Sequence, residues 1–239
     1  MERYEDIQEL FDTLDRNLVE LSASYDSARF NEEQATALRP LVKSIVSDLR
    51  SVLDYSAHTI YEAYSTKHFV GYFPFGEDEA GFVKAVKCNL NGLQVQRPDL
   101  YALVESIQPH KAANPWLHTL CKIAALTKHR ELGKQRRVNS GSVRTEIGCF
   151  VTSEGGSIIL NGVKYNGTVI GGGKPVVISE NRSLKEIESD FNMPIKGVRE
   201  YGKVAFYLDG FDVDALELLS TARQRIGVFV ESLKLAVGG

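Results

Sequence analysis

The chain has 239 residues, of which 43% are hydrophobic and 25% are charged. This length allows one large domain or two small ones, and the composition is typical of a soluble globular protein. No apolar run reaches the roughly 18 residues of a membrane helix, and the acidic N-terminus lacks the order of a signal peptide. Three cysteines without a CxxC pair argue against a disulfide framework or a zinc knuckle. We therefore expect a cytoplasmic protein with reduced thiols and no membrane contact.

Charge is distributed unevenly along the chain, although the net charge is only −3. Residues 1–35 contain ten acids and three arginines, whereas residues 122–144 contain seven bases and one acid. The basic segment can attract a polyanion such as nucleic acid. It can equally attract the acidic N-terminal segment of the same chain or of a partner subunit, so both explanations stay open.

The first half of the chain has the period of amphipathic helices. Apolar residues recur at three- and four-residue steps over 7–21 and again within 32–64, which predicts two long helices. Pro40 lies near the start of the second pattern, where its missing N–H is tolerated or the helix kinks. Short helices are expected at about 78–88 and 98–108.

Two further segments of this half are informative. Phe69–Gly76 is too apolar for a solvated loop, so we expect it to pack on the helices as an extended segment. Asn114 has the character of an N-cap and Pro115 that of a first helical residue. A helix is therefore predicted from there to about Leu132, with Gly133 just past its end.

After Arg137 the pattern changes to that of short strands. Nine glycines lie between Gly141 and Gly173, and the apolar residues come in short β-branched runs. Asn161-Gly162 and Asn166-Gly167 are hairpin-turn dipeptides. Strands are expected at 147–151, 157–160, 163, 169–170, 176–178, 195–199 and 203–208, the last two joined by a turn at 200–202.

The helical period returns from Phe211 to the end of the chain. Its apolar stripe has to be buried, most simply against the N-terminal helices. We therefore predict an α+β fold: a mainly helical bundle over 1–137, an antiparallel β section over 138–209 and a C-terminal helix over 210–239 that packs back on the bundle. The three parts are expected to form one compact unit.

Motifs for several kinds of chemistry are absent. The chain has no GxGxxG, HExxH or GxSxG motif, which are signals of dinucleotide-binding folds, zinc proteases and hydrolases. The sequence GGGK at 171–174 is followed by Pro175 rather than Ser or Thr, so we expect a turn between strands and not a phosphate-binding loop. His118 and His129 share a helix face but lie roughly 16 Å apart along it, too far to hold one metal ion. We expect neither a metal site nor a cofactor.

Arg50 and Asp54 are spaced i, i+4 on the second predicted helix. Such a pair is commonly a solvated ion pair that contributes about 0.2–0.5 kcal/mol. Alternatively, Asp54 orients a base on the helix that begins at Pro115. The run Lys128-His129-Arg130 at the end of that helix interacts favourably with exposed carbonyls, and it is also a candidate for phosphate contact.

Two segments resemble motifs of a large group of bacterial and phage proteins with a helical domain similar to the HEPN superfamily. Leu49–Ala57 is similar to that group's L-x-x-x-L-D-H-x-A helix. Asn114–Leu120, together with Lys128–Leu132, is similar to its P-x-W-x-L-x-x-L and D-K-H-R-x-L helix. The resemblance covers residues 35–137 by motif. It implies a helical bundle followed by a short β section and a closing helix.

HEPN ribonucleases cleave RNA without metal, using an Arg followed four to six residues later by a His, paired across a dimer. This chain has no Arg at that spacing before a His, and the nearest analogue is Lys122, with six residues between it and His129. The chain has Ala124-Ala125 and Thr127 where the group often has Asn and Asp. The resemblance implies a homodimer and RNA as a ligand, while the departures favour a shared fold over shared catalysis.

Three hypotheses about function follow. The first is a HEPN-like binding or interaction module whose bases contact nucleic acid, a nucleotide or an acidic partner: Lys128, Arg130, Lys134, Arg136 and Arg137. The second is a metal-independent ribonuclease in which His129 is the general acid/base, Asp54 orients it, and Arg50, Lys128 or Arg130 stabilises phosphate charge. The third is that Trp116, Leu117, Leu120 and Leu126 are core residues and the motif marks a structural helix.

Overall fold

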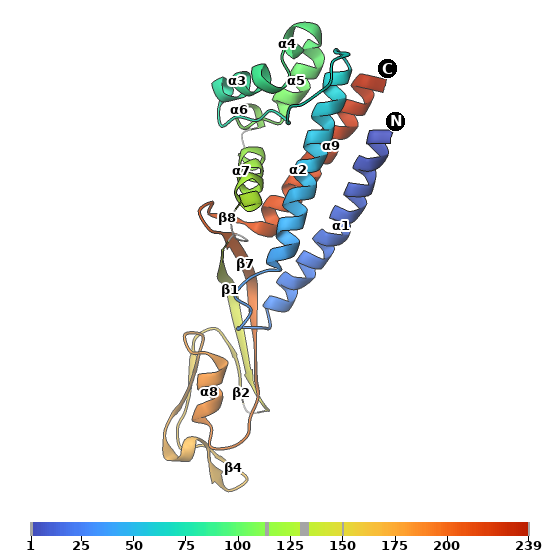
Figure 1. The fold of residues 1–239 in the computed structure, drawn as a ribbon. Coiled ribbons are helices and arrows are strands. Elements are labelled where there is room, and N and C mark those ends of the chain that lie inside the picture. Colours follow the sequence, from blue (N-terminus) through green and yellow to red (C-terminus); the bar gives the residue numbers. More distant parts are fainter. Residues whose placement is uncertain (1, 113–114, 130–133, 150, 239) are drawn as a thin grey trace. The chain divides into compact units, whose positions relative to one another are not determined.

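The computed structural model describes residues 2–112, 115–129, 134–149 and 151–238 (Figure 1). Within these ranges are nine α-helices, one 3-10 helix and eight β-strands. The helices, the antiparallel strand pairs and the C-terminal helix confirm the predicted α+β class. No helix in the described part of the chain is long and apolar enough to cross a membrane.

Contacts within the chain divide it into two units, each assembled from separate stretches of sequence. Unit 1 comprises Met1–Ser22, Leu38–Lys134 and Tyr207–Gly239, and it is mainly helical. Unit 2 comprises Ala23–Ala37 and Gln135–Phe206, and it holds most of the strands. The chain therefore passes between the units several times.

Long helices form the core of unit 1. They are α2 (Arg39–Glu62), α7 (Trp116–His129), α9 (Ala215–Gly238) and most of α1 (Glu2–Ala28). The closing helix α9 packs against α2, α7 and α5 (Pro98–Ser106), and α2 also packs against α7. α9 buries the apolar stripe that the sequence predicts, which includes Leu219, Ala222, Ile226, Phe229, Val230 and Leu233. The burial of this stripe explains why the terminal helix closes on the others.

The start of α2 differs from the prediction. The helix begins at Arg39 and not near residue 32, with Pro40 in its first turn. A proline is tolerated there because the first turn has no intrahelical partner for an N–H. Residues before Leu38 belong instead to a connection that folds with unit 2.

Four shorter helices follow α2 in the sequence. The helices predicted at 78–88 and 98–108 are confirmed as α3 (Glu79–Asn89) and α5. Two helices of a single turn, α4 (Leu93–Gln96) and α6 (Pro109–Ala112), were not predicted. α3 begins with a side-chain cap, because the Gly81 N–H donates to Asp78 Oδ1 at 2.7 Å.

The Phe69–Gly76 segment is extended and packed, as its composition predicts. Phe69 and Phe73 are buried, and the Phe73 ring lies edge-on against Phe229 of α9 with centroids 5.5 Å apart. The buried Gln108 fixes the end of the segment: its Oε1 accepts from the Gly76 N–H at 3.2 Å, and its Nε2 donates to the Pro74 carbonyl at 3.1 Å. The side-chain amide thus satisfies backbone groups that no strand partner satisfies.

Unit 2 is built on two long strands, β1 (Gln135–Ile147) and β7 (Gly197–Leu208), which pair with each other. On its other side β1 pairs with β2 (Val151–Glu154) in an antiparallel register that joins Thr145 to Ser153. The last two residues of β7 pair with β8 (Val213–Asp214) in unit 1. We call the β1–β7 pair the ribbon.

Two predicted features of this region are wrong. The run 147–151, expected as a strand, contains the turn that joins β1 to β2, with Ile147 paired to Val151. The turn expected at 200–202 lies inside the continuous strand β7. A Cβ on Gly202 would come within 3.1 Å of Ser142 N and O, so this glycine permits close strand contact rather than a turn.

The far part of unit 2 is a small module with its own core. β3 (Ser157–Leu160) pairs antiparallel with β6 (Val176–Ser179), and β4 (Lys164–Tyr165) pairs with β5 (Thr168–Val169). Helix α8 (Leu184–Asp190) packs against β6. The buried residues of this core are Ile147, Ile170, Val176, Ile178, Ile187 and Phe191.

Of the two predicted hairpin turns in this module, Asn166-Gly167 is confirmed, whereas Asn161-Gly162 joins β3 to β4, which do not pair with each other. Asn166 and Gly167 both have positive φ, 48° and 80°, as the two-residue hairpin turn between β4 and β5 requires. The glycines 171–173 form a 3-10 turn, Ile170–Gly173, between β5 and β6. The expected turn is therefore confirmed at GGGK.

Candidate functional site

Arg50 and Asp54, two of the predicted catalytic residues, form an ion pair on α2. Arg50 Nη2 lies 2.8 Å from Asp54 Oδ1. Both side chains also bind the extended segment: the Phe73 N–H donates to Asp54 Oδ1 at 2.8 Å, and Arg50 Nη2 donates to the Phe73 carbonyl at 3.3 Å. The predicted i, i+4 pair is present, but it is partly buried rather than solvated, and it anchors a stretch of backbone.

Arg50 also reaches α7. Its Nη1 donates to Cys121 Sγ at 3.0 Å, and its guanidinium lies 5.5 Å from the centroid of the Phe75 ring. Burial raises the pKa of the Cys121 thiol to about 11, so this sulfur stays protonated near neutral pH. Cys88 and Cys149 are exposed free thiols.

His118 of α7 joins the same group of residues. Its ring contacts Phe75 with centroids 6.1 Å apart, and its Nε2 lies 3.9 Å from Glu77 Oε2. Lys122 Nζ lies 4.0 Å from the same carboxylate oxygen. Burial lowers the pKa of His118 and Lys122 lowers it further, while Glu77 acts in the opposite direction, so the imidazole is neutral at pH 7. We call Arg50, Asp54, Phe75, His118 and Cys121 the α2–α7 cluster.

Sequence reasoning treats His118 as a lone histidine and misses its acidic neighbour. Glu77 precedes α3 and is distant in sequence, so no local spacing links it to α7. The sequence does show that His118 and Lys122 are spaced i, i+4 and so share one helix face, where both can contact the same carboxylate.

The predicted site is described only in part. Arg130 and the side chains of Lys128 and His129 lie outside the described residues, so the pairing of Asp54 with His129 stays a prediction. Of the residues expected to form the core of this helix, Trp116, Leu117 and Leu120 are buried, while Leu126 is 42% exposed.

Arg137, one of the predicted binding residues, is bonded to the chain's own backbone. Its guanidinium donates to the carbonyls of Ala28 at 2.8 Å and Gln34 at 3.0 Å, and also to that of Asn31. Its charge lies 5.2 Å from the centroid of the Tyr201 ring. Burial lowers its pKa, although a guanidinium stays charged at physiological pH. Arg137 thus holds the connection between α1 and α2 against β1.

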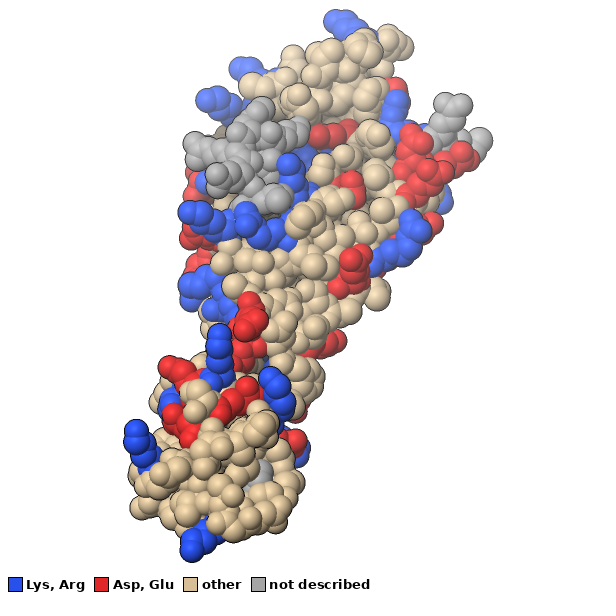
Figure 2. Space-filling model, turned by 60° about the horizontal axis from the view of Figure 1, so that its bottom comes forward, with Lys and Arg blue, Asp and Glu red and all other residues tan. Residues whose placement is uncertain are grey.

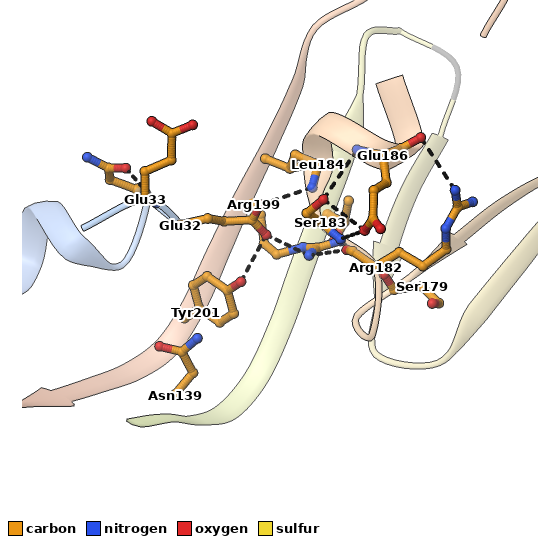
Figure 3. Close-up of polar contacts among 12 residues, drawn as sticks. Glu32, Glu33, Asn139, Ser179, Arg182, Ser183, Leu184, Glu186, Arg199 and Tyr201 are labelled. Atoms are coloured by element: carbon orange, nitrogen blue, oxygen red, sulfur yellow. Dashed lines mark hydrogen bonds and ion pairs between the residues drawn. The ribbon is translucent and has the colours of Figure 1, made fainter. Parts of the chain in front are cut away.

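A second arginine of unit 2 is more deeply buried. The Arg199 side chain is 1% exposed, and its Nη1 lies 2.6 Å from Glu32 Oε1 (Figure 3). Its other donors reach Thr145 Oγ1 at 2.9 Å and the carbonyls of Arg182 at 2.7 Å and Ser179 at 3.0 Å. A fixed guanidinium fork with this many acceptors cross-links three segments of unit 2.

Glu32 is equally well bonded. Its Oε1 also accepts from the Tyr201 hydroxyl at 2.9 Å, and its Oε2 accepts from the Leu184 N–H at 2.9 Å, at the start of α8 (Figure 3). We call Glu32, Arg199 and these partners the Glu32–Arg199 network. Because its charges are paired and hydrogen-bonded, the network is a structural feature of unit 2.

The remaining predicted bases of the described chain are exposed. Lys134 and Arg136 both face solvent at the start of β1. Arg136, Ser140, Ser142 and Arg144 of β1 are all exposed, and alternation places Arg137 on the face opposite its neighbour Arg136.

The facing strand adds one base to this surface. Lys203 of β7 is exposed, and its backbone N would lie 3.7 Å from a Cβ placed on Gly141. Glu146 pairs with Arg144 at 2.5 Å. We call Arg136, Ser140, Ser142, Arg144 and Lys203 the ribbon face.

Charge is sparse in the strands β3 to β6 of the far module. From Gly155 to Ser179 the only charged residues are Lys164 and Lys174. Figure 2 shows a mainly uncharged surface on the far module.

Among the described residues, no three His, Cys, Asp or Glu side chains lie together as a metal ion would require. Comparison of the chain with protein-family models, with curated proteins and with solved structures finds no match.

Proposed function

We propose that the chain is a HEPN-like binding module that contacts the phosphates of nucleic acid through the ribbon face. The observation that carries the proposal is the division of arginines on β1. Arg137 is bonded to the chain's own carbonyls, whereas the side chains of Arg136 and Arg144 are exposed. Arg137 is therefore engaged within the fold, while Arg136 and Arg144 remain accessible to solvent, Arg144 beside its ion-pair partner Glu146.

The chemistry of the ribbon face suits a phosphate backbone. Arginine and lysine neutralise phosphates, and the hydroxyls of Ser140 and Ser142 can donate to phosphate oxygens without reading sequence. A two-stranded β-ribbon is also one of the elements that enter the major groove of a duplex. These features support binding that depends strongly on salt and weakly on sequence.

The test is the salt dependence of binding to mixed-sequence duplex DNA and single-stranded RNA, measured by fluorescence anisotropy. The variant Arg136→Gln/Arg144→Gln/Lys203→Gln removes three bases from the ribbon face. We expect the slope of log K against log salt to become shallower by about 2.7 for duplex DNA and by about 2.1 for single strands. Affinity is expected to fall for all sequences alike.

The matched control removes three bases from the same unit but outside the ribbon. Lys164→Gln/Lys174→Gln/Lys185→Gln changes the net charge by the same amount at exposed positions. If this control weakens binding as much as the ribbon variant, attraction is a property of net charge and the proposal fails. Binding of a free nucleotide with unchanged affinity in the ribbon variant would also contradict it.

Gel analysis of the same RNA samples, with and without EDTA, separates binding from cleavage. A binding module leaves the RNA intact in every sample. RNA cleavage that persists in EDTA and disappears in His129→Ala would establish the metal-independent ribonuclease instead.

A further inference from the structure

A cavity of about 300 Å³ lies in unit 1 among α1, α2 and α9, apart from the ribbon face and from the α2–α7 cluster. This volume is at the lower end of the range for small-molecule sites, about 300–1,000 Å³. Every residue that lines it belongs to unit 1. No part of the proposed function uses it.

The floor of the cavity is apolar and well supported. Ile7 of α1 and Val230, Leu233 and Val237 of α9 line it. Ile7, Val230 and Leu233 are each at most 3% exposed, so their positions are fixed by the helix packing around them. A floor of this kind favours hydrocarbon over any polar group.

The rim of the cavity carries an excess of positive charge. Its charged lining residues are Arg3, Glu62 and Lys234. Arg3 Nη1 is paired with Glu62 at 2.5 Å, which leaves the ammonium of Lys234 as the excess charge.

Lys234 is positioned at this rim by an aromatic ring. Its Nζ lies 4.0 Å from the centroid of the Tyr4 ring, and the Tyr4 hydroxyl donates to Glu231 Oε1 at 2.6 Å. Among the side chains that the structure describes, no carboxylate is paired with Lys234. The ammonium is therefore held near the cavity by a cation–π contact and can accept an anionic partner.

We propose that this cavity binds a small anionic amphiphile, with a single acyl chain on the apolar floor and its carboxylate at Lys234. Each methylene that leaves water should tighten binding about fourfold until the floor is covered. A carboxylate that accepts from an ammonium contributes a further charge-assisted hydrogen bond. Loss of that bond corresponds to about a tenfold or greater loss of affinity.

The probe is octanoate, titrated into the full chain below its micellar concentration and followed by methyl NMR. Methyl signals of Val230, Leu233 and Val237 are expected to shift together. The methyl signals of Leu235 serve as an internal control, because this residue is on the same helix and 78% exposed. Hexanoate should bind about 16-fold more weakly, because it has two methylenes fewer.

Two variants and one neutral analogue test the two parts of the site. Val237→Trp should fill the cavity and abolish binding, with thermal unfolding as the check on folding. Lys234→Met keeps the aliphatic stem but should weaken octanoate at least about tenfold, while Lys87→Met, an exposed lysine of α3, should not. If Val237→Trp fails to fold, Lys234→Met and the methyl shifts still decide the question.

The outcomes that overturn the proposal are distinct. No shift of the floor methyls at millimolar octanoate would exclude an acyl site. Equal affinity for octan-1-ol would exclude the carboxylate contact, and unchanged affinity in both cavity variants would place binding elsewhere. None of these results bears on the ribbon face, so the nucleic-acid proposal stands or falls separately.

Discussion

At the scale of single residues, Glu32 is the position where one substitution should cost most in unit 2. Removing one partner of a buried ion pair leaves the other charge uncompensated, at a cost of about 3–5 kcal/mol. Arg199 is 1% exposed, so Glu32→Ala should lower the free energy of unfolding of unit 2 by about this amount. Amide hydrogen exchange of β1 and β7 in increasing urea measures it.

The neighbouring glutamate is a natural control for this prediction. Glu33 is exposed, and Glu33→Ala should change stability by less than about 0.5 kcal/mol. The double variant Glu32→Leu/Arg199→Met removes both charges and should lose less stability than the sum of the single variants. Equal exchange in Glu32→Ala and Glu33→Ala would show that the network contributes nothing.

Residues of this kind are not visible to sequence reasoning. Glu32 is one of ten acids among residues 1–35, and nothing local distinguishes it from Glu33. Its partners Arg199 and Tyr201 are far along the chain, so only tertiary structure selects it. Arg137 shows the same limit, because a base predicted to bind a ligand is bonded to the chain's own carbonyls.

At the scale of elements, Asp54 anchors the extended segment 69–76 to α2. Asp54→Ala removes an acceptor from the Phe73 N–H and the ion-pair partner of Arg50, both partly buried. We expect a loss of about 2–3 kcal/mol in the stability of unit 1, measured by urea denaturation with Trp116 fluorescence. Asp54→Asn keeps a side-chain acceptor and should lose roughly half as much.

Asp48, on the same helix, provides the contrast. Burial raises its pKa, because desolvation outweighs the hydrogen bond from Ser44. A carboxyl whose pKa is raised on folding costs stability above its unfolded pKa, so Asp48→Asn should leave unit 1 as stable as before or slightly more stable at neutral pH. A loss in Asp48→Asn as large as that in Asp54→Ala would show that the anchor has no special role.

Elements with a strong local period were predictable, and those fixed by tertiary contact were not. The helices α1, α3, α5, α7 and α9 follow from apolar spacing, because burial of one face is encoded within each segment. The prediction divided β7 into two strands at Gly202, because the sequence alone does not distinguish a glycine required by close strand contact from a glycine in a turn. Helix α8 was missed, although Ser183 and Glu186 form the capping box that marks its start.

The candidate site was predictable only where its residues are neighbours in sequence. The i, i+4 spacing of Arg50 and Asp54 gave their ion pair correctly. The burial of that pair and its bonds to Phe73 come from the extended segment, whose path no helical spacing predicts. The contact of Arg50 with Cys121 depends on how α2 packs against α7.

At the scale of the whole molecule, the two units are built from interleaved stretches of one chain. The sequence changes character near Arg137, close to the start of β1 at Gln135. It carries no signal that Ala23–Ala37, which comprises the end of α1 and the connection to α2, belongs with the strands. That assignment rests on long-range bonds such as those of Arg137 and Arg199.

Because each unit has its own buried core, we expect a core defect in one to leave the other folded. Ile178 is fully buried in the far module of unit 2, and Ile178→Ala should cost about 3 kcal/mol there. The single tryptophan, Trp116, lies in unit 1 and is 2% exposed, so its fluorescence reports on that unit alone. The urea midpoint seen by Trp116 should stay unchanged, while amide exchange of β3 and β6 accelerates.

Leu53→Ala, at a fully buried position of α2, is the reciprocal control. It should lower the Trp116 midpoint and leave the exchange of β3 and β6 as in the parent chain. A shift of the Trp116 midpoint in Ile178→Ala would instead show that the continuous α1 and β7 couple the units into one cooperative structure. In that case a ligand bound at the ribbon face would stabilise unit 1 as well, because a ligand that binds only the folded state raises the free energy of unfolding of the entire cooperative structure.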